Sequence, residues 1–355
     1  MVYILLTFFL FALFILNWKK DNILCFWITA LALFVLLVFR SYNVGADTLN
    51  YVNYFLEKQR YYSIQDSRNL EIGFEYYLRL LRFVWKDGTF FLFVNAIVTL
   101  SAPLFYIRKY SRFRALSLLL FVIFPANLYF LHFIALRQMI ASSMVLWAYY
   151  FYKEKGSIVL YVIFSLIAVS FHTTAIIVVF VFFLAEKVRI ARKFAYFMIL
   201  GTYIIGISGV LSFSEVLGWV FSLFPDSPLA RISGYVEWRG VAVNMKFLTF
   251  LTYFCLLVFY YVEDEYINDG VLKLLLIGVM LTNLFSGFPM LGRFSSYFLF
   301  FSVIAITYSW VRSLRQVRTL LFLIVIFYFI GSTINTMVYF DISNETKLLP
   351  YSFVF

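Results

Sequence analysis

The segment 157–185 restricts the possible fold of this chain more than any other stretch. About 29 residues long, it is apolar apart from hydroxyl groups and the imidazole of His172, whereas a helix that crosses a bilayer needs only roughly 20 residues. Basic residues flank it on both sides, with Lys153 and Lys155 before it and a cluster at 187–193 after it. Because short basic loops remain on the cytoplasmic side, we predict that the segment enters the membrane and returns. It would form a re-entrant hairpin or a broken helix with His172 near the outer tip.

The composition of the whole chain is that of a polytopic membrane protein. Of its 355 residues, 64% are hydrophobic and only 13% are charged, a balance that is typical of proteins that span a bilayer several times. The net charge of +11 comes mostly from short loops between apolar runs, so the positive-inside effect accounts for it and no nucleic-acid partner is predicted. Cys25 and Cys255 both lie in apolar runs and predict neither a disulfide nor a metal site.

The apolar runs predict an all-α integral-membrane domain that comprises residues 1–355 and has about 11–12 transmembrane segments. The runs are 3–17, 23–39, 89–107, 115–132, 136–152, 157–185, 194–211, 246–262, 271–287, 293–311 and 319–338. If 157–185 turns back, every basic loop faces the cytoplasm. The long loops 40–88 and 212–245 and the tail 339–355 then face the outside.

The first outer loop contains an amphipathic pattern. Apolar side chains recur there at helical spacing, at Phe74, Tyr77, Leu78, Leu81 and Trp85. Glutamates and arginines occupy the other faces of the same turns. The pattern predicts a helix near 70–86 that lies in the membrane interface.

Three arginines at the outer ends of apolar runs are the first candidates for a functional site. Arg40 closes the second run, Arg137 opens the fifth, and Arg293 opens the tenth. Charges beside hydrocarbon are costly unless they face a wet cavity or a partner, and guanidinium groups match phosphate oxygens. We therefore predict that the three bind a doubly anionic group such as a diphosphate. The alternative for each arginine is an anchor whose charge extends to the interface.

His172 and Asp47 are the candidates for acid–base chemistry. Neutral imidazole accepts a proton near neutral pH, and His172 lies between Ser170 and the hydroxyls of Thr173 and Thr174. Asp47 follows Arg40 closely, so it either orients a substrate hydroxyl or neutralises that arginine. A buried histidine satisfied by its neighbours is the alternative for His172.

The polar neighbours of these residues add a second group of candidates. Gln138 places another polar side chain beside Arg137, and Glu71 is most simply the polar face of the amphipathic helix. The sequence has no glycine-rich phosphate loop, no Cys/His metal spacing and no Ser-His-Asp order. We therefore predict neither a metal nor a cofactor.

Short motifs spread over nearly the whole chain carry a family resemblance. In order they are Arg40-Ser41-Tyr42-Asn43-Val44-Gly45-Ala46-Asp47 with Tyr51, Glu71-Ile72-Gly73-Phe74-Glu75-Tyr76, Arg137-Gln138-Met139-Ile140-Ala141, Phe171-His172-Thr173-Thr174-Ala175, Gly292-Arg293-Phe294-Ser295-Ser296-Tyr297 and Leu349-Pro350-Tyr351. With these motifs the chain resembles the EpsG family of bacterial polysaccharide polymerases, which is related to the Wzy O-antigen and exopolysaccharide polymerases. The family's usual Glu-Pro pair is Glu71-Ile72 here.

The resemblance implies a GT-C-like glycosyltransferase of the bacterial inner membrane with its active site facing the periplasm. Such enzymes join oligosaccharide repeat units carried on undecaprenyl diphosphate into O-antigen, capsule or exopolysaccharide, with the lipid diphosphate as leaving group. The implied partners are this lipid-linked oligosaccharide, membrane lipids, and a chain-length regulator and flippase of the same pathway. Tyr51, Glu71, Gln138, Tyr297 and Tyr351 fall in the matching motifs and become candidate contacts for the acceptor or its sugars.

Two other functions remain open from the sequence. A lipid-linked oligosaccharide flippase or transporter would handle the same substrate, although repeated halves or paired broken helices are typical of transporters. An O-antigen ligase would have similar size and chemistry, but it would transfer the chain to a lipid A core.

Overall fold

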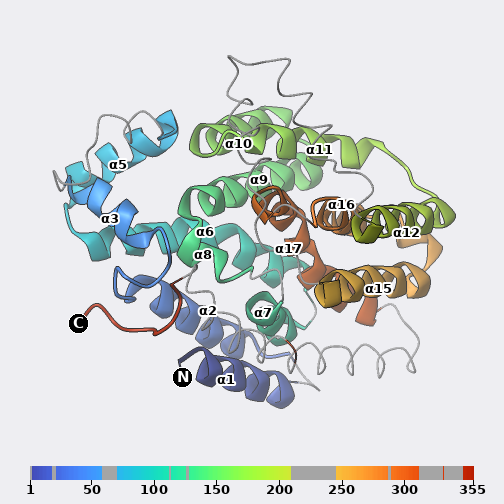
Figure 1. Ribbon diagram of the computed structural model, residues 1–355, viewed down its shortest axis with the longest axis horizontal. Helices are drawn as coiled ribbons and strands as arrows, with labels where there is room; N and C mark the ends of the chain where they lie inside the picture. The colour runs from blue at the N-terminus through green and yellow to red at the C-terminus, as the bar shows by residue number, and fades with distance from the viewer. Residues whose placement is uncertain are drawn as a thin grey trace. The chain divides into compact units, whose positions relative to one another are not determined.

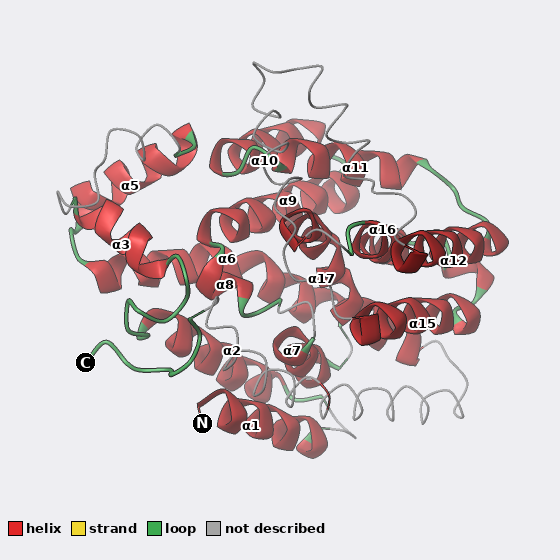
Figure 2. Ribbon diagram, viewed as in Figure 1, coloured by secondary structure: helices red, strands yellow, loops and turns green. Residues whose placement is uncertain are grey.

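The computed structural model describes residues 2–17, 21–57, 70–111, 113–124, 128–208, 245–286, 289–311, 331 and 347–355. Across these residues the regular structure is helical and no strand occurs (Figures 1 and 2). The prediction of an all-α chain is confirmed for them. The chain divides into two compact units, residues 1–179 with 322–355, and residues 180–321. The single membrane domain and its 11–12 spans stay predictions.

The first unit is built on helices that follow the predicted apolar runs. Its first half contains α1 (Val2–Leu16), α2 (Ile23–Val38), α6 (Gly88–Tyr110) and α7 (Arg114–Ile123). Among the described residues, α6 is the helix that is both long and apolar enough to cross a membrane, and several other apolar helices are shorter. Helix α6 packs against α2 and against α9 (Leu136–Lys155), which in turn packs along α10 (Ile158–Phe171).

The predicted run 115–132 is not one continuous helix. Helix α7 ends at Ile123, where Phe124 turns to an extended conformation, and the short helix α8 (Leu131–Ile134) follows. The residue after Phe124 is Pro125, and a proline pushes the residue before it out of the helical region. The steric effect of the proline therefore ends α7 within a segment that hydropathy alone predicted as one helix.

The predicted outer loop 40–88 contains two helices, α3 (Thr48–Leu56) and α5 (Ile72–Val84). The helix expected near 70–86 is confirmed as a helix, and its interfacial position stays a prediction. Trp85 lies just beyond its end in an extended conformation. Asp87 then caps α6 by accepting a hydrogen bond from the backbone N–H of Phe90 at 2.8 Å.

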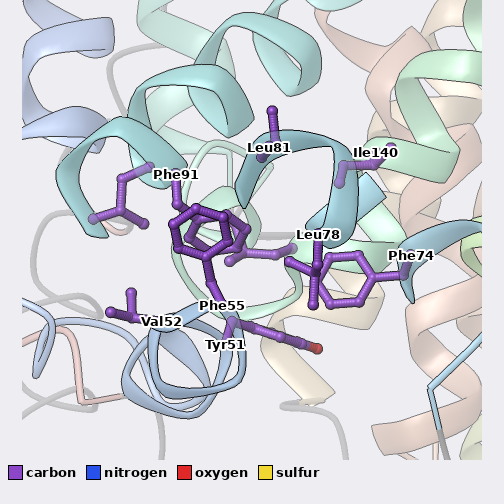
Figure 3. Close-up of a cluster of buried hydrophobic side chains, with 10 residues drawn as sticks. Tyr51, Val52, Phe55, Phe74, Leu78, Leu81, Phe91 and Ile140 are labelled. Atoms are coloured by element: carbon purple, nitrogen blue, oxygen red, sulfur yellow. The ribbon is translucent and has the colours of Figure 1, made fainter. Parts of the chain in front are cut away.

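An apolar cluster joins α3 and α5 to α6 and α9 (Figure 3). Its buried members are Tyr51, Val52, Phe55, Phe74, Leu78, Leu81, Phe91, Leu92, Leu136 and Ile140. Phe55 and Phe91 stack with ring centroids 5.0 Å apart, and Tyr51 meets the edge of Phe74 at 5.4 Å. This cluster fixes α3 and α5 beside the beginning of α9, which is where the candidate site lies.

The long segment 157–185 breaks where the sequence predicted. Gly156, with a φ of 63°, ends α9, and Ser157 caps α10. Helix α10 stops at Phe171, and α11 (Ala175–Lys187) begins after the turn 172–174. The hydroxyl of Tyr161 in α10 donates to the backbone carbonyl of Val179 in α11, so the chain turns back on itself. The break is confirmed, and the membrane side of its tip stays a prediction.

The second unit contains α12 (Arg192–Ser208), α15 (Met245–Tyr261), α16 (Gly270–Leu284) and α17 (Pro289–Val311), with the 3-10 turn η2 (Asp264–Tyr266). Asn283 of α16 is fully buried and connects two neighbours. It accepts from the hydroxyl of Thr252 at 3.1 Å and donates to that of Thr202 at 3.3 Å. The predicted loop 212–245 and run 319–338 lie outside the described residues, apart from Met245 and Gly331.

Candidate active site

Arg137 stands in the first turn of α9 and reaches across to two other helices. Its Nε donates to the hydroxyl of Tyr51 at 3.1 Å, and its Nη1 pairs with Oε2 of Glu71. The guanidinium carbon also lies 5.8 Å from the centre of the Tyr51 ring. A cation at the N-terminus of a helix is disfavoured, because that end of the helix dipole is positive. The negative charge of Glu71 offsets this repulsion on Arg137.

Glu71 lies between Arg137 and His172. It occupies the N-cap position of α5, but its side chain makes no capping bond. One carboxylate oxygen pairs with Arg137, and the other lies 3.4 Å from Nδ1 of His172. Burial raises the pKa of Glu71, but the imidazole and the guanidinium lower it more, so its pKa lies below the usual range. A helix N-terminus also favours the anion, and Glu71 is therefore ionised at neutral pH.

His172 occupies the break between α10 and α11. Its backbone is extended, and its N–H donates to the carbonyl of Ala168 at 3.0 Å, which closes the end of α10. Nδ1 is buried and faces Glu71, while 26% of the side chain is exposed. Because Nδ1 is buried, the exposed surface of the side chain belongs to its other atoms.

A glycine allows these residues to meet although they are far apart in the sequence. Gly73, in the first turn of α5, crosses the end of α10 so closely that a Cβ there would lie 2.7 Å from the backbone oxygen of Ser170. Phe171 then packs edge-on against Tyr77 at 5.5 Å. The close crossing holds Glu71 beside His172.

Tyr51 accepts a hydrogen bond from Arg137 and lies one helical turn after Asp47. Burial raises the pKa of Tyr51, Arg137 lowers it through its charge and hydrogen bond, and the charges of Asp47 and Glu71 raise it again. The net pKa is above the usual range, so the phenol stays protonated at neutral pH. Asp47 is half-buried one turn before Tyr51, at the beginning of α3. The structure thus gathers Asp47, Tyr51, Glu71, Arg137 and His172 in one region of the first unit.

Residues 22–353 match the family model described as the EpsG family. The chain belongs to the EpsG family. The resemblance inferred from its motifs is confirmed, and EpsG is a polysaccharide polymerase-like family. No curated protein and no solved structure gives a significant match. The matched residues of this EpsG protein begin at the N-cap of α2 and include the whole cluster around Arg137.

Arg40 of this EpsG protein has a different environment from Arg137. Its side chain is buried, with a residue exposure of 1%, and lies 4.7 Å from the centre of the Phe133 ring. It donates to the carbonyl of Leu37 at 2.7 Å and to the hydroxyl of Thr48 at 3.3 Å. Burial lowers its pKa to about 10, which still leaves it charged at neutral pH. In this arrangement Arg40 stabilises the end of α2, and its predicted role in diphosphate binding stays a prediction.

Two tyrosines complete the cap on α2. Tyr129 donates to the carbonyl of Leu33 at 2.7 Å, and Tyr351 donates to that of Leu36 at 3.0 Å. The last turn of a helix leaves carbonyls without partners inside the helix, and Tyr351 and Arg40 supply partners for those of Leu36 and Leu37. Tyr129 adds a bond one turn earlier. Tyr351, predicted as a sugar contact, is thus held against α2 in this structure.

The C-terminal residues 347–355 form what we call the C-terminal strap. Its backbone pairs with the stretch that carries Arg40. The N–H of Ser41 donates to Ser352 at 2.8 Å, that of Gly45 to Lys347 at 2.8 Å, and that of Val354 to Phe39 at 3.0 Å. The strap therefore fixes the turn that leads into Asp47 and α3.

The remaining predicted site residues are Gln138, Arg293 and Tyr297. Gln138 is buried beside Arg137 in α9. Arg293 and Tyr297 belong to α17 of the second unit, where Tyr297 is buried. Among the described residues there is no group of three or more His, Cys, Asp or Glu side chains suited to a metal ion.

Sequence reasoning missed the close crossing of Gly73 and Ser170 and the position of Glu71 between Arg137 and His172. An available signal was the glycine itself, since an isolated glycine in a helical pattern often marks a close approach.

Proposed function

We propose that this EpsG-family protein is a glycosyltransferase that joins undecaprenyl-diphosphate-linked oligosaccharide repeat units at the outer leaflet of the bacterial inner membrane. Membership of a polysaccharide polymerase-like family supports the reaction class. The observation that assigns the reaction to particular residues is the contact of Glu71 with both Arg137 and His172. It places a cation suited to a diphosphate and an imidazole suited to a hydroxyl proton on either side of one carboxylate.

In this proposal Arg137 binds the diphosphate of the donor. A guanidinium pairs with phosphate oxygens through parallel hydrogen bonds, and the side chain of Arg137 is 26% exposed. As the glycosyl–oxygen bond breaks, its electron pair stays on the diphosphate, and the fixed positive charge stabilises it. Arg293 is proposed as a second diphosphate contact on the strength of its sequence motif.

His172 acts as the base for the acceptor. A sugar hydroxyl of the incoming unit attacks the anomeric carbon, and its proton passes to Nε2 as the new bond forms. The diphosphate is a good leaving group that needs little acid assistance, so proton removal from the acceptor is the step that benefits most. Asp47 and Tyr51 then orient the acceptor or Arg137.

The test is polymer formation in cells that lack the native gene. Arg137→Ala and His172→Gln are expected to abolish long polymer while lipid-linked single units accumulate and the protein remains in the membrane. General base catalysis typically contributes about 10²–10⁴-fold, which is enough to remove a polymer ladder from a gel. Arg137→Lys should restore only part of the activity, because a point charge does not replace a bidentate fork.

The exposed ion pair of Arg79 and Glu75 provides a matched control, since both residues lie on α5 and their side chains are largely open to solvent. Arg79→Ala should leave polymer length unchanged. Normal polymer in both Arg137→Ala and His172→Gln would refute the site. Lipid-linked units that accumulate on the cytoplasmic side would indicate a flippase, and loss of transfer to lipid A core alone would indicate a ligase.

A further inference from the structure

Glu71 divides its two oxygens between groups with different roles. Oε2 forms a hydrogen-bonded ion pair with Arg137. Oε1 lies 3.4 Å from Nδ1 of His172, but the contact is long and poorly aligned, so the buried Nδ1 has no well-formed hydrogen bond. The carboxylate of Glu71 therefore bonds mainly to Arg137, and the imidazole of His172 lacks a good hydrogen-bond partner at Nδ1.

A buried ring nitrogen without a partner carries a cost, and a small movement of Glu71 would remove it. The carboxylate needs only to weaken its bond to Arg137 and approach Nδ1. A diphosphate is the ligand that would cause this, because its oxygens compete with the carboxylate for the same guanidinium N–H groups. The negative charge that arrives at Arg137 would also repel Glu71 from it.

We propose that Glu71 is a positioning residue that couples donor binding to activation of the base. When a diphosphate occupies Arg137, Glu71 turns from the guanidinium to His172 and accepts a hydrogen bond from Nδ1–H. That bond fixes the neutral tautomer in which Nε2 carries the lone pair. This inference rests on the proposed function of Arg137 and His172.

The coupling has a clear chemical consequence. With Nδ1–H held by Glu71, Nε2 accepts the proton of the acceptor hydroxyl while the new glycosidic bond forms. The diphosphate leaves with the electron pair of the broken bond and remains on Arg137. The imidazolium that results is stabilised by the carboxylate, which is not itself protonated. His172 is therefore an effective base only while a donor is bound.

Nitrogen-15 NMR tests the coupling directly, because the chain contains only two histidines, His132 and His172. The purified full chain is labelled on its histidine rings, and the signals lost in His172→Gln identify His172. Spectra are recorded at about pH 8.5, where imidazole is ordinarily neutral, with and without inorganic pyrophosphate as the probe. Ring nitrogen shifts distinguish Nδ1–H from Nε2–H. The signals of His132, which is buried, report whether each variant is folded.

We expect pyrophosphate to shift wild-type His172 to the Nδ1–H tautomer. Arg137→Ala should show that tautomer without pyrophosphate, because Glu71 is then released permanently. Glu71→Ala should not reach it under either condition. The control Glu75→Ala should behave as the wild type, since Glu75 pairs with the exposed Arg79 instead.

The outcomes separate the coupling from the proposed function. If pyrophosphate binds by calorimetry but neither it nor Arg137→Ala changes the tautomer, the coupling is overturned while the diphosphate site stands. If pyrophosphate does not bind and Arg137→Ala still gives Nδ1–H, Glu71 does exchange between Arg137 and His172, but the diphosphate assignment fails and the coupling to donor binding fails with it. The tautomer of His172 surviving in Glu71→Ala would overturn the role of Glu71.

Discussion

Gly73 controls the site at the scale of single residues. Its lack of a side chain lets α5 cross the backbone of Ser170, and this crossing sets the distance between Glu71 and His172. A methyl group there would overlap both the side chain and the backbone oxygen of Ser170. Because a backbone oxygen has no rotamer that relieves the overlap, α5 itself would have to move.

Gly73→Ala is therefore expected to reduce polymer formation severely while the protein still accumulates. Gly201→Ala in α12 is the matched control, since a Cβ there would meet nothing within 4 Å. Alanine is favoured over glycine in a helix by about 1 kcal/mol, so the control should be neutral or slightly stabilising. Adding Ser170→Gly to Gly73→Ala removes two of the three close atoms and should restore part of the polymer ladder. Equal activity of Gly73→Ala and Gly201→Ala would show that the crossing is not critical.

Glu71 also gives the protein a specific dependence on pH. Its pKa is lowered in the folded state, so its stabilising contribution is fully present above the unfolded value of about 4.3 and is lost as pH falls through the folded value. Thermal unfolding of wild type and Glu71→Gln should differ at neutral pH and converge in strong acid. Glu75→Gln, at an exposed pair, should show little difference at either pH. A constant gap for Glu71→Gln down to strong acid would contradict the ionised pair.

At the scale of elements, the C-terminal strap and the end of α2 support each other. The strap bonds the backbone of Ser41 and Gly45, and Arg40 bonds both α2 and Thr48 of α3. The stretch that carries Asp47 is therefore held by the strap through its backbone and by Arg40 through its side chain.

Deletion of residues 347–355 should loosen this stretch before it affects the rest of the first unit. Hydrogen exchange at the amides of Ser41 and Gly45 should become faster, and polymer formation should fall.

Tyr351→Phe removes one hydrogen bond and should cost about 1 kcal/mol of stability. Arg40→Ala should cost more, about 2–3 kcal/mol, because the lost bonds are made by a charged group. If Arg40→Ala leaves the melting temperature unchanged but stops polymerisation, Arg40 is a substrate ligand after all.

A comparison of the observed helices with the predicted ones shows which features could be read from the sequence. Apolar runs predicted most helices closely, and basic flanks predicted the break at 172–174, because both are local properties. The run 115–132 was misread, since hydropathy ignores the steric effect of Pro125. Arg137 and His172 were recognised as unusual polar residues beside apolar runs. Their link through Glu71 was not, because it joins residues 66 positions apart in the chain and depends on a helix crossing.

At the scale of the whole molecule, topology is the decisive prediction. Cysteine labelling should place Lys153 and Arg189 on the cytoplasmic side and Thr173 on the outside, with the two native cysteines replaced beforehand. The reason is that the segment between the basic clusters turns back at 172–174, so both clusters can remain inside. Labelling of position 189 from the outside would separate the proposed site from the outer leaflet.

The strap has a consequence for biogenesis. Tyr351 and its partner Leu36 are 315 positions apart, so α2 reaches its final capped state only after residue 351 has been synthesised. At about 5–20 residues per second, this takes on the order of 15–60 seconds. Throughout that interval the end of α2 lacks the backbone bonds that the strap makes with Phe39, Ser41 and Gly45. The hydrogen bond from Tyr351 is therefore absent while the intervening helices are being synthesised.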